Sequence, residues 1–245
     1  MIREYKQGRT PNPDILCNKE IKFDVFMKYA LSLKANYIAT GHYCKKNKIG
    51  KNYTLEQGKD KLKDQSYFLC QINQEQLKRI LFPIGHLTKK QVRKIAEEEK
   101  LVTAQKKDSQ GLCFVGKIKL PIFLQTELKP RKGDIIEISK SSKIYTLDSD
   151  NIVYTKKDGI KIGSHQGAHY YTIGQRKGLH IGGKKDPLFV LSTDVVKNII
   201  YVGMSQEHPG LFRKTIKIKH KDVHWLQTEK KMKTGDKTDY LVRIR

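Results

Sequence analysis

The sequence is poor in cysteine and has no long apolar run. Its 245 residues include 4 cysteines, at positions 17, 44, 70 and 113, and no two of them form a CxxC pair. This sparseness excludes a disulfide-stapled secreted scaffold and argues against a structural zinc site. No apolar stretch approaches the roughly 18 residues of a membrane helix, and the first residues do not resemble a signal peptide. We therefore expect a cytoplasmic protein with reduced thiols, no membrane association and no bound metal.

Several motifs of common enzyme classes are also missing. The chain has no G-x-x-x-x-G-K-[ST] loop, no H-E-x-x-H helix, no paired-carboxylate motif and no other nucleotide-binding glycine loop. These absences exclude a P-loop nucleotidase and a zinc protease of the common type.

Acidic residues are scarce relative to basic ones. The chain carries 49 Lys+Arg against 25 Asp+Glu, a net charge of +24. The cations occur mostly as scattered doublets, which are compatible with a lysine-coated, solvated surface. They are equally compatible with attraction to a polyanion, of which nucleic acid is the most plausible.

The first half of the chain has an α/β pattern. Two prolines and a glycine in residues 8–14 argue against a helix there. Apolar residues on one face predict a helix over 23–31, and residues 37–40 predict a short buried strand that ends at Gly41. In α/β sheets, ligands bind at the carboxyl ends of strands. This strand end is therefore a candidate site.

Two further helices are predicted before the pattern changes. Residues 74–81 read as a short helix, and Thr88 with Gln91 forms the capping box of a better one. Beyond a boundary near residue 130, short β-prone runs recur between turns. The predicted strands cover residues 135–138, 152–155, 170–173, 189–191, 199–202, 216–218 and 240–244.

Two cysteines lie where a thiol could be reactive. Cys17 lies near the start of a helix, and Cys113 lies in a glycine-containing loop that follows Lys106, Lys107 and Asp108. Both environments favour the thiolate. A redox or sulfur-carrying pair is one interpretation, and two unrelated cysteines are the commoner one for an arbitrary cytosolic chain. Cys44 is expected to be exposed among lysines and Cys70 to belong to the core, whereas a four-cysteine metal site would require all four to converge.

Three polar segments have both a functional and a structural interpretation. His42, which follows the strand end, is either a ligand contact or a capping hydrogen bond. Residues 63–67 on their own read as a solvated loop. Residues 174–179, with two cations between glycines, suit a phosphate contact, although such turns are often merely exposed.

Five motifs in a fixed order resemble one known family. They are GRTPNPD with CN (residues 8–14 and 17–18), ATGHY (39–43), KDQSYFL (63–69), KDSQGLCF (107–114), and HQG with TIGQRKGL (165–167 and 172–179). Together they resemble the tRNA-specific 2-thiouridylase family, and the resemblance covers nearly the whole chain.

The resemblance implies a fold of α/β plus β type. Residues 1–66 would be the C-terminal part of an adenine-nucleotide α-hydrolase-like (PP-loop) domain. Residues 67–130 would form a central, mostly helical tRNA-binding domain, and residues 131–245 a β-rich, partial C-terminal barrel. The family's Ser-Gly-Gly-x-Asp-Ser loop is not present in this sequence. A truncated thiouridylase is therefore expected.

The resemblance also implies a reaction, the ATP- and Mg²⁺-dependent 2-thiolation of wobble uridine 34 in tRNAs for Lys, Glu and Gln. Cys113 would carry a persulfide supplied by a sulfur-relay protein or cysteine desulfurase. Cys17 would be the nucleophile that completes sulfur release, leaving a Cys17–Cys113 disulfide. Asp14 would act as general acid or base.

The remaining implied contacts are with substrates, and the protein would act as a monomer. By motif matching, the target base would contact Asn12, Pro13 and Asp14, ATP would contact Gly41, and the rest of the tRNA would contact His42, Lys63, Asp64, Gln65 and Arg245. Two other functions stay open. One is a catalytically silent tRNA-binding remnant, and the other is a thiol–disulfide oxidoreductase that uses Cys17 and Cys113.

Overall fold

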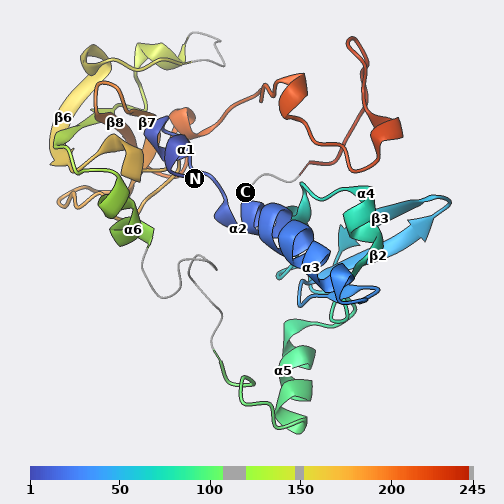
Figure 1. Cartoon of the computed structure of the whole chain (residues 1–245). Coiled ribbons are helices and arrows are strands. Elements are labelled where there is room, and N and C mark those ends of the chain that lie inside the picture. The colour runs from blue at the N-terminus through green and yellow to red at the C-terminus, as the bar shows by residue number, and fades with distance from the viewer. Residues whose placement is uncertain (107–119, 147–151, 243–245) are drawn as a thin grey trace. The chain divides into compact units, whose positions relative to one another are not determined.

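The computed structural model describes residues 1–106, 120–146 and 152–242 (Figure 1). The chain divides into two compact units, each built from two separate stretches. The first unit comprises residues 1–13 and 110–217, and the second unit comprises residues 14–109 and 218–245. The three-part division expected from the sequence stays a prediction.

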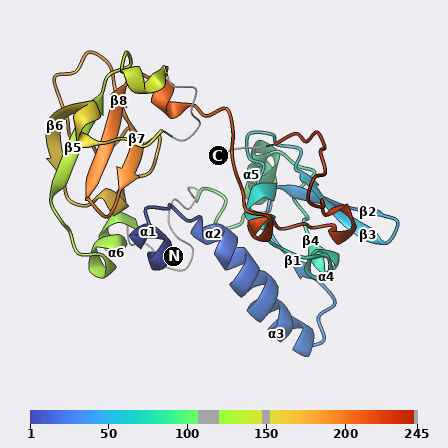
Figure 2. The ribbon, with the colours of Figure 1, turned by 90° about the horizontal axis from the view of Figure 1, so that it is seen from above.

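A long helical segment opens the second unit (Figure 2). It runs without interruption through α2 (Pro13–Leu16), the π-helical η1 (Cys17–Phe26) and α3 (Met27–Ser32). The prediction that prolines keep residues 8–14 out of a helix is wrong at the end of that stretch, because proline is tolerated in a first helical turn. The predicted helix over 23–31 is confirmed. However, Phe26 is 52% exposed, since i→i+5 turns change which residues share a face.

The core of the second unit gathers around this helix and a short parallel sheet. Strand β1 (Ile38–Ala39) is the predicted strand, and it pairs in parallel with β4 (Ile80–Leu81). The helix predicted over 74–81 ends earlier, because α4 (Gln74–Lys78) stops and the chain becomes β4. The buried residues of the cluster are Phe23, Met27, Ile38, Cys44, Leu69, Ile72, Leu77 and Ile80.

A lysine-rich hairpin that the sequence did not predict completes this unit. Strands β2 (Cys44–Ile49) and β3 (Asn52–Gln57) pair antiparallel around a two-residue turn. Figure 1 shows α4 beside this hairpin, and the contacts between α4 and β3 agree. The hairpin lacks a clean apolar alternation because only one residue of β2, Cys44, is buried.

The remaining elements of the second unit are helical turns. Helix α5 (Lys89–Glu98) begins with the predicted capping box of Thr88 and Gln91, after the short turn η2 (Ser66–Leu69). Residues 218–242 contain only the turns η7 (His220–Asp222) and η8 (Thr228–Lys230). The strands predicted at 216–218 and 240–242 are therefore absent, and residues 243–244 of the second lie outside the described residues.

The first unit is built on a four-stranded sheet. Its strands are β5 (Gly133–Ile138), β6 (Gly159–His165), β7 (Leu188–Asp194) and β8 (Ile199–Met204), in the order β6-β5-β8-β7 (Figure 2). The central β5–β8 pair is parallel and the outer pairs are antiparallel. The strands predicted at 135–138, 189–191 and 199–202 are confirmed, whereas β6 was not predicted.

Short helices take the place of two predicted strands in this unit. Residues 152–155 lead into η4 (Lys156–Asp158), because Thr155 caps that turn. Of residues 170–173, Tyr170 ends η5 (Ala168–Tyr170) and the other three follow it. Helices α1 (Ile2–Lys6) and α6 (Leu120–Glu127) share a small cluster around Tyr5. The turns η3 (Lys143–Tyr145) and η6 (Pro209–Leu211) complete the unit.

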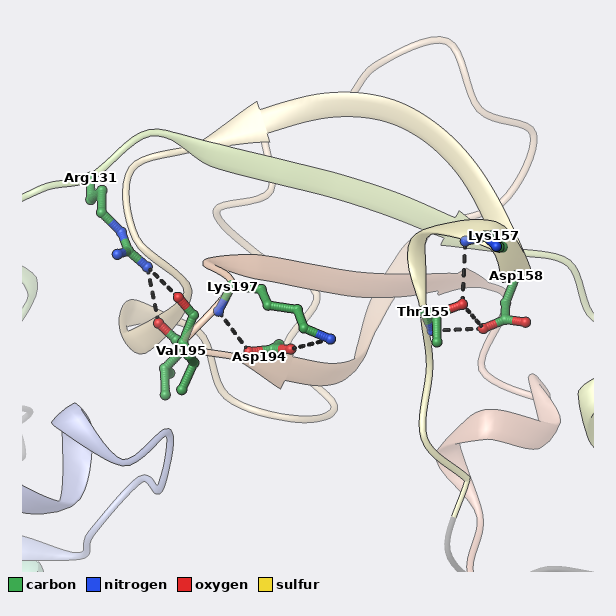
Figure 3. Close-up of polar contacts among 8 residues, drawn as sticks. Arg131, Thr155, Lys157, Asp158, Asp194, Val195 and Lys197 are labelled. Carbon is green, nitrogen blue, oxygen red and sulfur yellow. Dashed lines mark hydrogen bonds and ion pairs between the residues drawn. The ribbon is translucent and has the colours of Figure 1, made fainter.

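Polar contacts tie the loops of the first unit to its sheet (Figure 3). The Arg131 guanidinium donates to the carbonyls of Val195 and Val196, both at 3.1 Å. Asp194 accepts from the Lys197 backbone N–H at 2.8 Å, which closes the β7–β8 turn. The Asp158 carboxylate likewise accepts from the Thr155 backbone at 2.6 Å. These bonds satisfy backbone groups that would otherwise lack partners.

One lysine of the hairpin caps helix α4. Lys46 Nζ donates to the carbonyls of Leu77, Lys78 and Ile80 at 3.1, 3.0 and 2.6 Å, and it lies 5.0 Å from the ring centroid of Tyr53. A cation suits the carbonyl end of a helix. Burial lowers the pKa of Lys46 from its ordinary value.

Replacement of Lys46 by methionine is expected to destabilise the second unit by about 1.5–3 kcal/mol, because hydrogen bonds from a charged donor are lost while the aliphatic stem is kept. Urea unfolding followed by the fluorescence of Trp225, which is the only tryptophan and lies in this unit, measures the change. Lys48→Met on the same strand is the matched control and is expected to change stability little. Equal effects of both substitutions would contradict the capping role.

Candidate functional site

The candidate site lies at the carboxyl end of β1 in the second unit. Gly41 is exposed there, and a Cβ at this position would meet only Ile84 Cδ1, at 4.0 Å. The strand end is therefore open to close approach by a ligand. The position agrees with the rule that ligands of parallel sheets bind beyond the carboxyl ends of strands.

His42 points into the protein rather than outward. Its side chain is 9% exposed, and its ring centroid lies 6.1 Å from that of Phe23 and 6.4 Å from that of Phe82. Nδ1 shares a 2.9 Å hydrogen bond with Thr40 Oγ1, which is a side-chain contact at the strand end and not the predicted cap on a backbone group. Burial, with a smaller effect of Lys22, lowers the pKa of His42 to about 4. The imidazole is therefore neutral at physiological pH, and its contact with tRNA stays a prediction.

The KDQ segment is tied to the same strand end. Gln65 accepts from the Tyr43 backbone N–H at 3.0 Å and donates its own backbone N–H to the Tyr43 carbonyl at 3.3 Å. Asp64 is 2% exposed and accepts from the backbone and hydroxyl of Ser66, at 3.2 and 3.0 Å. The solvated loop expected for residues 63–67 is therefore wrong at Asp64, and only Lys63 of the triplet is exposed.

The third motif joins this group through Asn18. Its Nδ2 donates to the Phe68 carbonyl at 3.1 Å, and its side chain is 1% exposed. Its Oδ1 is buried without a hydrogen-bond partner among the residues that the structure describes. The motifs at residues 17–18, 39–43 and 63–69, which are far apart in sequence, are thus brought together in one unit.

Cys17 occupies the first position of η1, next to Asn18, and is 7% exposed. The accessible thiol expected at this position is therefore largely covered. Asp14 lies in the first turn of α2, Pro13 begins that helix, and Asn12 is exposed just before it. Cys113 and Arg245 lie outside the described residues, so their predicted roles, including the Cys17–Cys113 disulfide, stay predictions.

The environments predicted for the other two cysteines are wrong. Cys44 is 0% exposed because it faces the core at the start of β2, and burial raises its pKa to about 12. Cys70 is exposed where η2 ends. Within the described part of the chain, no three His, Cys, Asp or Glu side chains gather as metal ligands.

Sequence reasoning gave no role to Tyr43 or Asn18, which connect the motifs. Tyr43 acts through its backbone, which leaves no signal in its residue type. Asn18 lies outside the helix predicted over 23–31, so the sequence pattern gave no signal for its burial.

Acidification is expected to destabilise the second unit through His42. The folded pKa of about 4 lies below the ordinary value of 6.5, so the unfolded chain binds the proton more readily. The stability contribution is complete above about pH 6.5 and falls as the pH drops towards 4, by about 2 kcal/mol at about pH 5. Urea unfolding at several pH values, followed by Trp225 fluorescence, measures it. His42→Gln removes the titrating group and is expected to flatten the profile, whereas an unchanged profile would place the effect elsewhere.

Comparisons with known proteins place this arrangement in a family. Residues 1–117 match the family model for the tRNA methyl transferase HUP domain, and residues 122–204 match that for the tRNA methyl transferase PRC-barrel domain. The chain thus joins a HUP domain, of nucleotide-α-hydrolase-like fold, to a PRC-barrel domain.

Three curated relatives identify the family more narrowly than the two domain models do. The chain is 54% identical to tRNA-specific 2-thiouridylase MnmA of Flavobacterium johnsoniae, over 100% of the chain and 67% of that protein. It is 51% identical to the proteins of the same name from Christiangramia forsetii and Karelsulcia muelleri, again over 100% of the chain and 67% of each relative. The chain belongs to the tRNA-specific 2-thiouridylase family.

No helix in the described part of the chain has both the length and the apolar character needed to cross a bilayer.

Proposed function

We propose that the chain is a tRNA-uridine 2-sulfurtransferase that thiolates the wobble uridine 34 of tRNAs for Lys, Glu and Gln. The observation that carries the proposal is the similarity to 2-thiouridylases along the entire chain, at 54% identity with the Flavobacterium johnsoniae relative. The meeting of the motifs at residues 17–18, 39–43 and 63–69 in the second unit supports it.

In the proposed reaction, ATP with Mg²⁺ is a co-substrate that adenylates the C2 oxygen of the uridine. Gly41 fits this step, because the open strand end gives a nucleotide room to approach. The described residues contain no glycine-rich phosphate loop, so no residue is assigned to the triphosphate. The tRNA would contact His42, Lys63, Asp64, Gln65 and Arg245.

The sulfur step uses the two thiols. The terminal sulfur of a persulfide on Cys113, loaded by a sulfur-relay protein or cysteine desulfurase, attacks C2, and the C2–O bond breaks as AMP leaves. Cys17 then completes release of the sulfur, and the sulfurs of Cys17 and Cys113 end as a disulfide. Asp14, near the target base with Asn12 and Pro13, would move the proton. A thiolate is required of Cys17, so the protein has to uncover this 7%-exposed side chain during the cycle.

The three segments of the chain that the sequence predicts would have different roles. Residues 1–66 would provide the nucleotide-binding part, residues 67–130 the central tRNA-binding part and residues 131–245 a β-rich part, in a cytoplasmic monomer.

A tRNA-binding remnant without catalysis is the second candidate. The thiol–disulfide oxidoreductase is the third candidate, and like the proposed reaction it would require the 7%-exposed side chain of Cys17 to be uncovered.

A thiolation assay separates the candidates. The 245-residue chain is incubated with unmodified tRNA, ATP, Mg²⁺ and a cysteine desulfurase with cysteine, and 2-thiouridine is detected by gel retardation on a mercury-containing matrix. ATP-dependent retardation is expected. Binding of tRNA without thiolation would establish the remnant, and turnover of a small disulfide without RNA would establish the oxidoreductase.

A further inference from the structure

One motif of the first unit is not used by the proposed reaction. It is the loop of residues 174–187, which joins η5 to β7 and contains the cations Arg176, Lys177, Lys184 and Lys185. These four cations lie on one short connection of the first unit. The loop will be called the basic loop.

Apolar anchors fix the basic loop to the sheet. Leu179 is 5% exposed and belongs to the cluster on one face of the sheet, where Ile181 packs beside it. Gly163 in β6 leaves the space that the Ile181 side chain fills, since a Cβ there would lie 2.4 Å from Ile181 Cδ1. The apolar residues of the loop thus point inward, while the cations are exposed.

Hydrogen bonds hold the turn that carries Arg176 and Lys177. The Gly174 N–H donates to the Val190 carbonyl at 2.7 Å, and the Val190 N–H donates back to the Gln175 carbonyl at 3.0 Å. The Gln175 side chain donates to the Lys177 carbonyl at 2.8 Å. A turn fixed in this way loses little conformational entropy when it binds a ligand.

The backbone of the basic loop also suits an anion. Gly178 and Gly183 have φ angles of +87° and +71°, which only glycine adopts easily, and no atom lies within 4 Å of a Cβ built at Gly183. The loop borders an open surface hollow of about 560 Å³, whose lining includes Arg176, His180, Lys184 and Lys185. Glycine backbone without side chains, together with cationic side chains around a hollow, is suited to binding a phosphate group.

The charges of the basic loop are incompletely neutralised. Lys184 pairs with Glu137 at 2.5 Å. Arg176, Lys177 and Lys185 form no ion pair with any residue that the structure describes, and Asp186 is the one acidic side chain that lines the hollow. Mutual repulsion among these cations is relieved when a polyanion binds.

We propose that the basic loop binds phosphodiester groups of the RNA backbone and so docks the tRNA on the first unit. This inference rests on the proposed function. The triphosphate of ATP offers the same chemistry, so the test includes an ATP arm.

The experiment compares two charge-matched triple variants of the full chain. The loop variant is Arg176→Gln, Lys177→Gln and Lys185→Gln. The control variant is Lys132→Gln, Lys143→Gln and Lys157→Gln, three exposed lysines of the same unit. Affinity for unmodified tRNA is measured by fluorescence anisotropy at several salt concentrations, affinity for ATP by calorimetry, and folding by circular dichroism.

The loop variant is expected to bind tRNA at least about tenfold more weakly at low salt, with a salt slope smaller by about 2–3, since each phosphate contact contributes about 1. The control variant is expected to change affinity less than about threefold, and ATP affinity is expected to be the same in all proteins. Equal losses in both variants would show diffuse attraction and overturn the inference, as would a selective loss of ATP binding. If the unaltered chain bound no tRNA, the proposed function itself would fail.

Discussion

Replacement of Cys113 by serine is expected to abolish 2-thiouridine formation and to leave tRNA affinity unchanged. A serine hydroxyl cannot carry a persulfide, so the rate is expected to fall by roughly 10⁴-fold or more, as when other covalent catalytic groups are removed. Cys17→Ser is expected to block turnover as well, because sulfur release depends on the second thiol. The thiolation assay measures the rate of 2-thiouridine formation, and an anisotropy titration with the same tRNA measures the affinity.

Cys70 offers the matched control. It is an exposed thiol outside the proposed chemistry, so Cys70→Ser is expected to keep the rate within about twofold of the unaltered chain, as surface changes commonly do. A Cys113→Ser protein that still thiolates tRNA would refute the persulfide role, and equal losses in all three variants would indicate a general dependence on thiols.

The second large effect is expected on stability, at Gly203 in β8. A Cβ there would lie 2.6–2.7 Å from three ring atoms of His208, a side chain with 0% exposure. The ring cannot move aside easily, because it bonds the Ile138 carbonyl and the Gly210 N–H, both at 3.1 Å. Gly203→Ala is therefore expected to destabilise the first unit by about 2–3 kcal/mol.

Near-ultraviolet circular dichroism during urea unfolding measures this loss, because tyrosines lie around His208. Gly182→Ala, at a position with no atom within 4 Å, is the matched control and is expected to be nearly neutral. In a His208→Ser background the same Gly203→Ala change is expected to cost less, since the clash is gone. A cost that did not depend on residue 208 would contradict the steric explanation.

The helices and strands that were predicted correctly are those that depend mainly on residues close together in the sequence. The capping box of Thr88 and Gln91 is local, and β7 and β8 are apolar enough to be recognised. The hairpin of β2 and β3 was missed because β2 is mostly lysine and asparagine, with Cys44 as its one buried residue, so it shows no apolar alternation. Residues 152–155 and 170–173 have strand-like composition but lead into or follow short helical turns.

Sequence motifs predicted which residues belong to the candidate site, but they did not predict which of these residues are buried. The sequence identified Gly41, His42 and the KDQ triplet, yet it did not show that Asp64 and His42 are buried. The environments of Cys44 and Cys70 were exchanged, because burial depends on which strand face or helical turn meets the core, and that is decided by contacts distant in sequence. The residues alone left the pairing of Cys17 with Cys113 as one of two interpretations, and the family resemblance favoured it.

A single-turnover sulfur transfer tests the central claim most directly. The chain is loaded with labelled sulfur on its cysteines, freed of excess donor, and mixed with unmodified tRNA, with and without ATP and Mg²⁺. Labelled sulfur is expected to leave Cys113 and to appear in 2-thiouridine at the wobble position only when tRNA, ATP and Mg²⁺ are all present. Label that stays on the protein, or is released as sulfide regardless of tRNA and ATP, would contradict the account.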